Sequence, residues 1–401
     1  MALPFDKIEP QVQQMGVEVA DRGSTLAEQT ISALDLLRRM DDLEAIWAQI
    51  LTARQNDAGF RGAAPMDEPI NVSIPLPECP PLATVYAADG SQIYPDPHAP
   101  APYWLTNIGV FVYHHGVDRL PEIVVEPELF FREADVRDRE GRLIPSAVIN
   151  ARRTVYEMQM LSKVATRDAA DADPRIALYD GPLIGMPMGK DVPNANMLAA
   201  DYHEAVDFMY DLGVALAGYV DRPSSRFMIY TILLMTLEQE QITRGNVGGA
   251  TFEGVNDQDL YKVILKPGER SGLMIQQSPL NKEYKDRHGD HQEICFFYLN
   301  TASAGQEAYL ARVEIPMWVA QRKPLVNAVH AVLYSQCQIT DRYPYALTRA
   351  DEIAVVQPAE KRHLEDMIAV ELLRNRQALE ASRKLNTKNL ARHGRRHYEG
   401  V

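Results

Sequence analysis

The chain has 401 residues, of which 46 % are hydrophobic and 24 % are charged, and these are the proportions of a globular protein. Its 23 glycines and 26 prolines exclude a fibrous or low-complexity class. The longest mostly apolar run, Phe227 to Met235, is too short to span a bilayer. The N-terminal residues lack a basic segment followed by an apolar stretch, and three widely spaced cysteines do not fit a disulfide framework. We therefore expect a soluble, reduced, cytoplasmic protein that contacts no membrane.

The formal net charge of −14 argues against a nucleic-acid partner, because affinity for phosphate normally comes from Lys and Arg. Carboxylates around a metal ion weaken this argument, since a bound cation offsets their charge. Basic residues are also unevenly placed: Arg374 to His397 contains eight Lys or Arg and one acid, Glu380. This tail is either a solvated helix end or a segment that contacts phosphates.

Residues 7–55 are predicted to be helical, because Ala27, Ile31, Leu34 and Leu37 recur at helical spacing among charged residues. Residues 56–80 are rich in Pro, Gly and Asp, which is typical of a linker or loop. The sequence therefore predicts a helical N-terminal arm over 1–55, suited to an interaction, and a linker over 56–80.

The segment after this linker alternates between predicted strands and helices. Predicted strands and helices follow one another at 82–88, 103–114 and 122–131 (strands), 146–166 (helix), 175–179 (strand), 199–213 (helix), 214–220 (strand) and 224–237 (helix). Three antiparallel strands that lead into two α/β units follow the order of the ribonuclease H-like fold. We therefore expect an α/β protein with a ribonuclease H-like core around a mixed five-stranded sheet.

The C-terminal part adds further elements to this core. Several strands are expected within 261–318, a helix near 320–337, a turn at the Tyr-Pro-Tyr segment 343–345, and a last long helix from about Thr348 or Pro358. The main domain is predicted to cover 81–356, and a C-terminal helix with a basic tail covers 357–401.

Two of the predicted strands end in an acid followed by glycine, at Asp89-Gly90 and at Asp180-Gly181. A strand that ends in this way places its carboxylate at the edge of the sheet, where glycine lets a ligand or backbone approach closely. The alternative interpretation is a simple turn, because Asp-Gly is a common turn pair. Both pairs, however, lie on the strands that carry metal ligands in this topology.

The helix between these strands contains a single acid, Glu157, among five Lys or Arg residues over 141–167. Glu157 lies beside the predicted buried stripe, and a carboxylate with apolar neighbours is costly unless it is paired or bound to a cation. It forms either an ion pair with Arg153 across one turn or part of a metal site. We favour the metal site.

Divalent-metal phosphoryl chemistry requires several carboxylates at one place, and hard oxygen ligands suit Mg²⁺ or Mn²⁺. Two such ions can activate water and stabilise the leaving oxygen of an in-line displacement. Asp89, Glu157 and Asp180 come from elements whose ends are neighbours in this fold. A fourth acid is available at Asp351 or Glu352.

Three motifs together resemble the NurA family of DNA double-strand-break repair nucleases. They are Asp89-Gly-Ser after a strand, Asp180-Gly after a strand, and Tyr343-Pro-Tyr-Ala-Leu-Thr-Arg-Ala-Asp351-Glu, and the similarity covers about 80–356. The resemblance implies a dimeric, Mn²⁺-dependent (or Mg²⁺-dependent) nuclease with a ribonuclease H-like core. It further implies 5′-to-3′ exonuclease and single-strand endonuclease activity together with the hexameric ATPase HerA.

The same resemblance carries Asp89, Glu157 and Asp180 over as metal ligands and Tyr343 as an active-site tyrosine. The family usually has His where this sequence has Asp351. Aspartate can still bind a hard cation, so Asp351 is predicted to be the fourth ligand; its alternative role is to cap a helix that begins near Glu352.

Two other functions fit part of this pattern. One is a non-catalytic adaptor for DNA ends or for the ATPase, which the substitution at Asp351 favours and the other three acids oppose. The second is a ribonuclease H-like enzyme that acts on RNA or on recombination junctions. Cleavage of labelled DNA with and without metal distinguishes these hypotheses.

Overall fold

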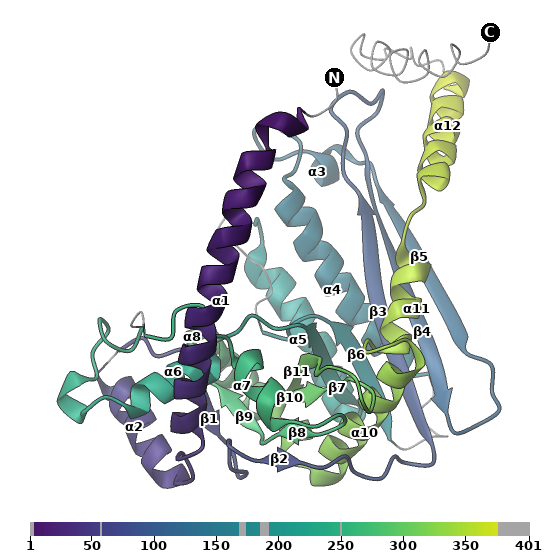
Figure 1. The fold of residues 1–401 in the computed structure, drawn as a ribbon. Helices are drawn as coiled ribbons and strands as arrows, with labels where there is room; N and C mark the ends of the chain where they lie inside the picture. Colours follow the sequence, from purple (N-terminus) through teal and green to yellow (C-terminus); the bar gives the residue numbers. More distant parts are fainter. Residues whose placement is uncertain (1–3, 57, 168–173, 185–191, 249–250, 376–401) are drawn as a thin grey trace. The chain divides into compact units, whose positions relative to one another are not determined.

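The computed structural model describes residues 4–56, 58–167, 174–184, 192–248 and 251–375 (Figure 1). The chain divides into two compact units. Unit 1 consists of Met1–Ala83, Asp173–Gly185 and Gly213–Tyr345, and unit 2 of Thr84–Ala172, Met186–Leu212 and Ala346–Val401. Within the described ranges, every helix is too short or too polar to cross a membrane. The predicted basic tail lies, from residue 376 on, outside the described residues.

Unit 2 is built on three consecutive strands in the order β3-β4-β5, and its helices follow them in the sequence. Its elements are β3 (Ala83–Ile93), β4 (Trp104–His115), β5 (Glu122–Phe130), α3 (Glu133–Val136), α4 (Ser146–Ala165), α5 (Ala195–Asp211), α11 (Tyr345–Ala354) and α12 (Pro358–Arg374). Strands β4 and β5 are antiparallel, with Gly109 opposite Val125. The apolar stripe of α4 is buried, and Ile149 of this helix belongs to a cluster with the stacked rings of Trp104 and Phe130.

Unit 1 contains a mixed sheet in the order β1-β9-β10-β11-β7-β6, in which β6 and β7 are parallel and the other pairs are antiparallel. The strands are β1 (Ala63–Pro65), β2 (Ser73–Ile74), β6 (Arg175–Asp180), β7 (Ala215–Asp221), β8 (Arg270–Ser271), β9 (Met274–Gln276), β10 (Ile294–Asn300) and β11 (Leu310–Pro316). The helices are α1 (Glu9–Leu37), α2 (Leu43–Gln55), α6 (Phe227–Met235), α7 (Asp257–Ile264), α8 (Pro279–His288), α9 (Met317–Ala320) and α10 (Lys323–Ile339). Every residue of β10 and β11 is buried, because neighbouring strands and helices cover them.

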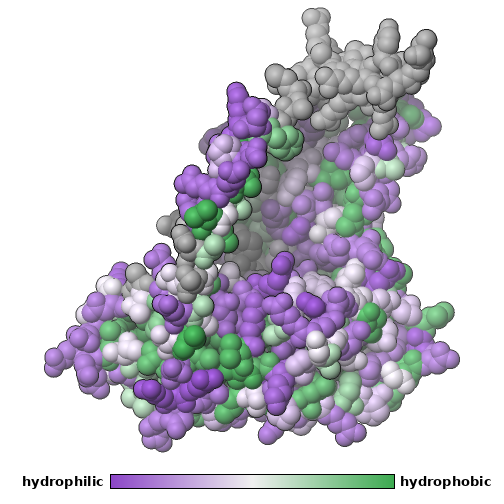
Figure 2. Space-filling view, viewed as in Figure 1, coloured by the Kyte–Doolittle hydropathy of each residue, from purple (hydrophilic) through white to green (hydrophobic). Residues whose placement is uncertain are grey.

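The predicted N-terminal arm is only partly separate from unit 1. Leu34 and Leu37 of α1 and Ile46 of α2 lie in one hydrophobic core with the apolar helix α6. The earlier turns of α1 expose apolar side chains between polar ones, as Figure 2 shows. Met1–Ala83 as a whole belongs to unit 1.

The segment 56–80, predicted to be a linker, is part of the folded unit. It contributes β1, which pairs with β9, and β2, which pairs with β8. Its Glu68 accepts two hydrogen bonds from the buried Arg270, at 2.7 and 2.9 Å. Burial would raise the pKa of Glu68, but the hydrogen bond and charge of Arg270 outweigh this and lower it. Strands of two or three residues are too short to show an alternating pattern, so the sequence indicates only a loop there.

The predicted order β-β-β-α-β-α-β-α is confirmed by β3, β4, β5, α4, β6, α5, β7 and α6. The helix predicted at 146–166 spans Ser146–Ala165. One expectation was wrong, because β3 does not stop at Asp89 but continues to Ile93. The several strands expected within 261–318 are β8 to β11, and the region also contains helix α8.

A buried histidine on α10 makes the stability of unit 1 depend on pH. The ring Nε2 of His330 lies 2.7 Å from the carbonyl oxygen of Gly268. Burial lowers the pKa of His330 from 6.5 to about 4, although this hydrogen bond opposes the change. The unfolded chain therefore binds a proton that the folded chain does not, at pH values between 4 and 6.5. We expect the contribution of neutral His330 to the free energy of unfolding to be fully present above pH 6.5. Towards pH 4 it should fall by up to about 3 kcal/mol.

The measurement is urea unfolding of the wild type and of His330→Gln across this pH range. The stability of the wild type relative to the variant should decrease by about 3 kcal/mol between pH 7 and pH 4. Burial raises the pKa of Asp257 to about 6, so this residue has the opposite pH dependence. Asp257 is present in both proteins, and its contribution cancels in the difference. A constant difference at all pH values would contradict this prediction.

Candidate active site

Unit 2 packs Glu157 of α4 against β3 at Gly90, the residue that follows Asp89. A Cβ atom built on Gly90 would lie 2.6 Å from Glu157 Oε1 and 2.8 Å from Ile108 Cδ1. No side chain larger than a hydrogen atom fits there, so β3 and α4 approach each other closely at Gly90. Asp89 precedes this contact, and its Oδ1 accepts a hydrogen bond from the Gly90 backbone N–H at 2.7 Å.

The side chains around Asp89 point to two faces of β3. Gln92 faces α4, because its Oε1 accepts a hydrogen bond from Arg153 Nη1 at 2.7 Å. Ser91 faces α11, because its hydroxyl donates to the carbonyl oxygen of Ala354. Since side chains alternate along a strand, Asp89 shares the face of Ser91 and α11, whereas Glu157 contacts the other face at Gly90.

Glu157 is only 4 % exposed, as the apolar pattern around it predicts. Arg153 Nε lies 3.0 Å from Glu157 Oε1, so the ion pair of the alternative interpretation is present. This pair compensates the burial of the carboxylate without a metal ion. The role of Glu157 as a metal ligand therefore remains a prediction.

Sequence reasoning missed three residues of β3 and β4 that contact the C-terminal end of α11. Ser91 and Asn107 form hydrogen bonds with it, and Gly109 packs closely against it. The carbonyl oxygen of Ala354 accepts hydrogen bonds from the Ser91 hydroxyl and from Asn107 Nδ2, the latter at 2.8 Å. A helix end leaves such carbonyl groups without intrahelical partners. At Gly109, an added Cβ would lie 2.9 Å from Ala354 N. A glycine inside the largely buried strand β4 is the one signal that could have indicated this contact.

We expect Gly109→Ala to destabilise the protein by about 1–3 kcal/mol, because the new methyl group forces α11 away from β4. Thermal unfolding measures the effect. Gly245→Ala is the matched control, since an added Cβ at Gly245 meets no atom within 4 Å. Equal melting temperatures of the two variants would show that α11 does not pack closely on β4.

Asp351 does not cap a helix, so that alternative is wrong. Helix α11 begins at Tyr345, and Asp351 lies in its last turn, where its carbonyl oxygen accepts from Val355 N at 3.0 Å. The Asp351 side chain is exposed, and the neighbouring Glu352 forms an ion pair with Arg349.

We expect Asp351→Ala to lower metal-dependent cleavage by about 10- to 100-fold, if this side chain supplies a ligand oxygen. The melting temperature should hardly change, because the side chain is exposed and alanine favours helices. The matched control is Glu352→Ala, which removes the same charge from the adjacent position. Equal activity of both variants would remove Asp351 from the site.

Unit 1 places Asp180 at the end of β6, as predicted. Asp180 is the last residue of this strand and lies opposite Tyr219 of the parallel strand β7. The chain turns at once, since Gly181 adopts a φ of +131° and donates its N–H to the Tyr219 carbonyl oxygen at 2.9 Å. Asp180 thus lies at the carboxyl end of two parallel strands, where α/β proteins bind ligands.

Tyr343 lies next to the same strand end. Its ring centroid is 5.2 Å from that of Tyr219, edge to face. The Tyr219 hydroxyl donates to the carbonyl oxygen of Arg342 at 3.1 Å, and Thr301 Oγ1 donates to the same oxygen at 2.9 Å. Burial raises the pKa of Tyr219 well above 10, which keeps this hydroxyl a donor. Unit 1 therefore gathers Asp180 and Tyr343 around Tyr219.

A buried ion pair fixes the loop that follows Asp180, and no pattern in the sequence indicated it. Glu314 of β11 is 1 % exposed and accepts a hydrogen bond from Leu183 N at 2.7 Å. Arg312 Nη2 lies 2.8 Å from the other carboxylate oxygen of Glu314. The pair thereby ties residues 181–184 to the centre of the sheet.

The predicted ligands supply carboxylate oxygens, the donors that Mg²⁺ and Mn²⁺ prefer, so their chemistry fits such an ion. Asp89, Glu157 and Asp351 belong to unit 2, whereas Asp180 and Tyr343 belong to unit 1. In the part of the chain that the structure describes, no three His, Cys, Asp or Glu side chains form a group that could hold a metal ion. The complete ligand set is thus a prediction of the sequence.

The order of elements and the mixed sheet of unit 1 define an α/β protein with a ribonuclease H-like core. The NurA domain model matches residues 83–356, which is about two thirds of the chain. The chain therefore belongs to the NurA family, as the three motifs predict.

The solved structures that match the chain include two NurA proteins. The NurA nuclease from Sulfolobus solfataricus is 10 % identical, with a TM-score of 0.53 over 92 % of this chain and 98 % of that one. A NurA bound to dAMP and manganese is 10 % identical (TM-score 0.37, 72 % and 88 % covered). The catalytic domain of human Endonuclease V is 12 % identical (TM-score 0.33, 81 % and 98 % covered). No curated protein matches the sequence.

Proposed function

We propose that the chain is a metal-dependent DNA nuclease. The observation that supports this most is its membership of the NurA family together with acids at the motif positions Asp89 and Asp180. The Sulfolobus protein of the same fold is described as a nuclease. A structure of another NurA holds manganese and dAMP, which agrees with a divalent cation and a nucleotide product.

In this proposal Asp89, Glu157, Asp180 and Asp351 would hold one or two Mn²⁺ or Mg²⁺ ions. Such an ion supplies Lewis-acid stabilisation of the phosphodiester and an activated water molecule. Tyr343, held against Tyr219, would donate a hydrogen bond to a phosphate oxygen.

The finer assignments rest on the resemblance. They are 5′-to-3′ exonuclease and single-strand endonuclease activity on DNA ends, a homodimer, and a HerA-type hexameric ATPase as partner. An acidic nuclease needs help to hold and advance duplex DNA, and a translocating motor supplies this help. The exposed apolar residues Val12, Met15 and Val19 of α1 make this helix a candidate contact.

The decisive experiment is digestion of end-labelled single- and double-stranded DNA with Mn²⁺, Mg²⁺ or EDTA. The proposal expects cleavage with metal, none with EDTA, and products that report the polarity. Absence of cleavage with either metal would favour the non-catalytic adaptor. Sedimentation and co-purification with the matching ATPase test the dimer and the partner, and a monomer that captures no ATPase would contradict both.

A further inference from the structure

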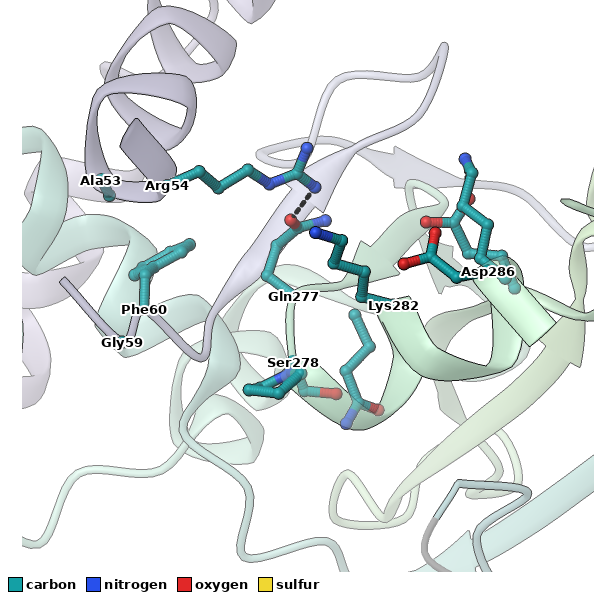
Figure 3. A pocket seen from close by; sticks show the side chains of 12 residues that line it. Ala53, Arg54, Gly59, Phe60, Gln277, Ser278, Lys282 and Asp286 are labelled. Atoms are coloured by element: carbon teal, nitrogen blue, oxygen red, sulfur yellow. Dashed lines mark hydrogen bonds and ion pairs between the residues drawn. The ribbon is translucent and has the colours of Figure 1, made fainter. Parts of the chain in front are cut away.

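Unit 1 contains a cavity of about 470 Å³ that none of the predicted site residues lines. Helix α2, the turn that follows it, the end of β9 and helix α8 form its walls (Figure 3). This volume is within the range of small-molecule sites.

Two cations from different helices point into this cavity. Arg54 of α2 and Lys282 of α8 extend towards each other beside Gln277, as Figure 3 shows. Arg54 donates a hydrogen bond to the Gln277 amide oxygen, and its guanidinium group lies 5.7 Å from the centroid of the Trp47 ring. Within the described residues, neither Arg54 nor Lys282 forms an ion pair with a carboxylate. Most of their N–H donors are therefore available to an anion.

The other charges of the wall leave an excess of positive charge. Lys285 is neutralised by Glu293, whose Oε2 lies 2.9 Å from Lys285 Nζ. Asp286 is the remaining acid of the lining, one helical turn after Lys282. A further cation lies behind the wall, since Arg244 Nε is 3.5 Å from the position of a Cβ built on Gly59. A group with more than one negatively charged oxygen, such as a phosphate, complements this arrangement.

The cavity also offers groups that suit a nucleobase. Gln276 is 8 % exposed, and its amide oxygen is buried without a hydrogen-bond partner among the described residues. An N–H group of a ligand would satisfy this acceptor. Phe60 lines the same cavity with an aromatic ring, which stacks with bases of any kind.

We propose that this cavity binds a nucleotide, with its phosphate between Arg54 and Lys282 and its base against Phe60 and the Gln276 amide. The nucleotide is either a free mononucleotide or one unit of a DNA single strand. Binding of a strand rests on the proposed nuclease function, whereas binding of a mononucleotide does not.

The test measures binding to the full chain in EDTA, which prevents metal-dependent cleavage. Two measurements separate a free mononucleotide from a unit of a DNA strand as the source of the phosphate. Calorimetry measures the binding of dTMP and of inorganic phosphate, and fluorescence anisotropy measures the binding of labelled (dT)12. The double variant Arg54→Gln/Lys282→Gln should bind each of these ligands at least about tenfold more weakly than the wild type. For (dT)12, the magnitude of the slope of log K against log salt should fall by about 0.7, because the contact with one phosphate is lost. The matched control is Arg287→Gln on α8, which lies outside the cavity and pairs with Glu283.

Gln276→Leu tests the base contact, because it should weaken the binding of dTMP but not the binding of inorganic phosphate. Equal affinity of the double variant and the control for every ligand would overturn the proposal, as would a wild type that binds none of them. Circular dichroism checks the fold, and the exposed single variant Lys282→Gln replaces the double variant if the latter unfolds. Normal dTMP binding by a chain that cleaves no DNA would contradict the proposed function and leave this site intact.

Discussion

Asp89→Asn is expected to lower DNA cleavage by at least about 10³-fold while the protein folds normally. The substitution removes the negative charge that a metal ligand needs, and several kcal/mol of transition-state stabilisation are lost with the ion. Folding should be unaffected, because the asparagine side-chain oxygen can still accept the Gly90 N–H that Asp89 Oδ1 accepts at 2.7 Å. Asp180→Asn should have the same effect on cleavage.

The measurement compares initial rates on labelled DNA with saturating Mn²⁺, together with melting temperatures. Asp118→Asn is the matched control, since Asp118 is exposed in the same unit and belongs to no predicted site. Cleavage by Asp89→Asn within a few-fold of the control would remove Asp89 from the site. A large loss of stability would mean that the residue acts in folding.

The order of strands and helices could be predicted because burial leaves a periodic pattern in each element. The single acid among apolar positions of α4 indicated that Glu157 is buried, and it is. The ion pair with Arg153 is the alternative that the sequence analysis did not favour. The end of β3 could not be predicted, since Asp89-Gly90 has the local signature of a turn. Gly90 is required instead for the close contact with Glu157, and this contact depends on packing between separate elements.

The residues that support the candidate site were missed for a related reason. Ser91 is hydrogen-bonded to a residue 263 positions away, and Glu314 to one 131 positions away. No local pattern records such partners, because each side chain alone is an ordinary polar residue in a strand. Asp180 could be predicted, since the strand and its glycine turn are adjacent in the sequence.

Glu157→Gln is expected to lower cleavage by at least about 100-fold and to remove most of the stabilisation of the fold by Mn²⁺. A ligand at 100 times its dissociation constant stabilises the folded state by about 2.7 kcal/mol, and loss of a ligand carboxylate removes most of this effect. The alternative is that Glu157 serves only Arg153, 3.0 Å away. The variant would then cleave normally and keep the full Mn²⁺ effect, with a modest loss of stability.

Arg153→Gln separates these roles further, because it removes the cation and keeps the carboxylate. Arg153 is partly exposed, whereas Glu157 is buried, so this variant leaves a buried negative charge without its partner in α4. If Glu157 binds metal, the variant should be less stable than the wild type in EDTA and should recover most of the loss when Mn²⁺ is added. If Glu157 is only a partner of Arg153, Mn²⁺ should raise the melting temperature of both proteins equally. The stability losses of Arg153→Gln and Glu157→Gln should then not add in the double variant that combines them, since each substitution removes the same ion pair.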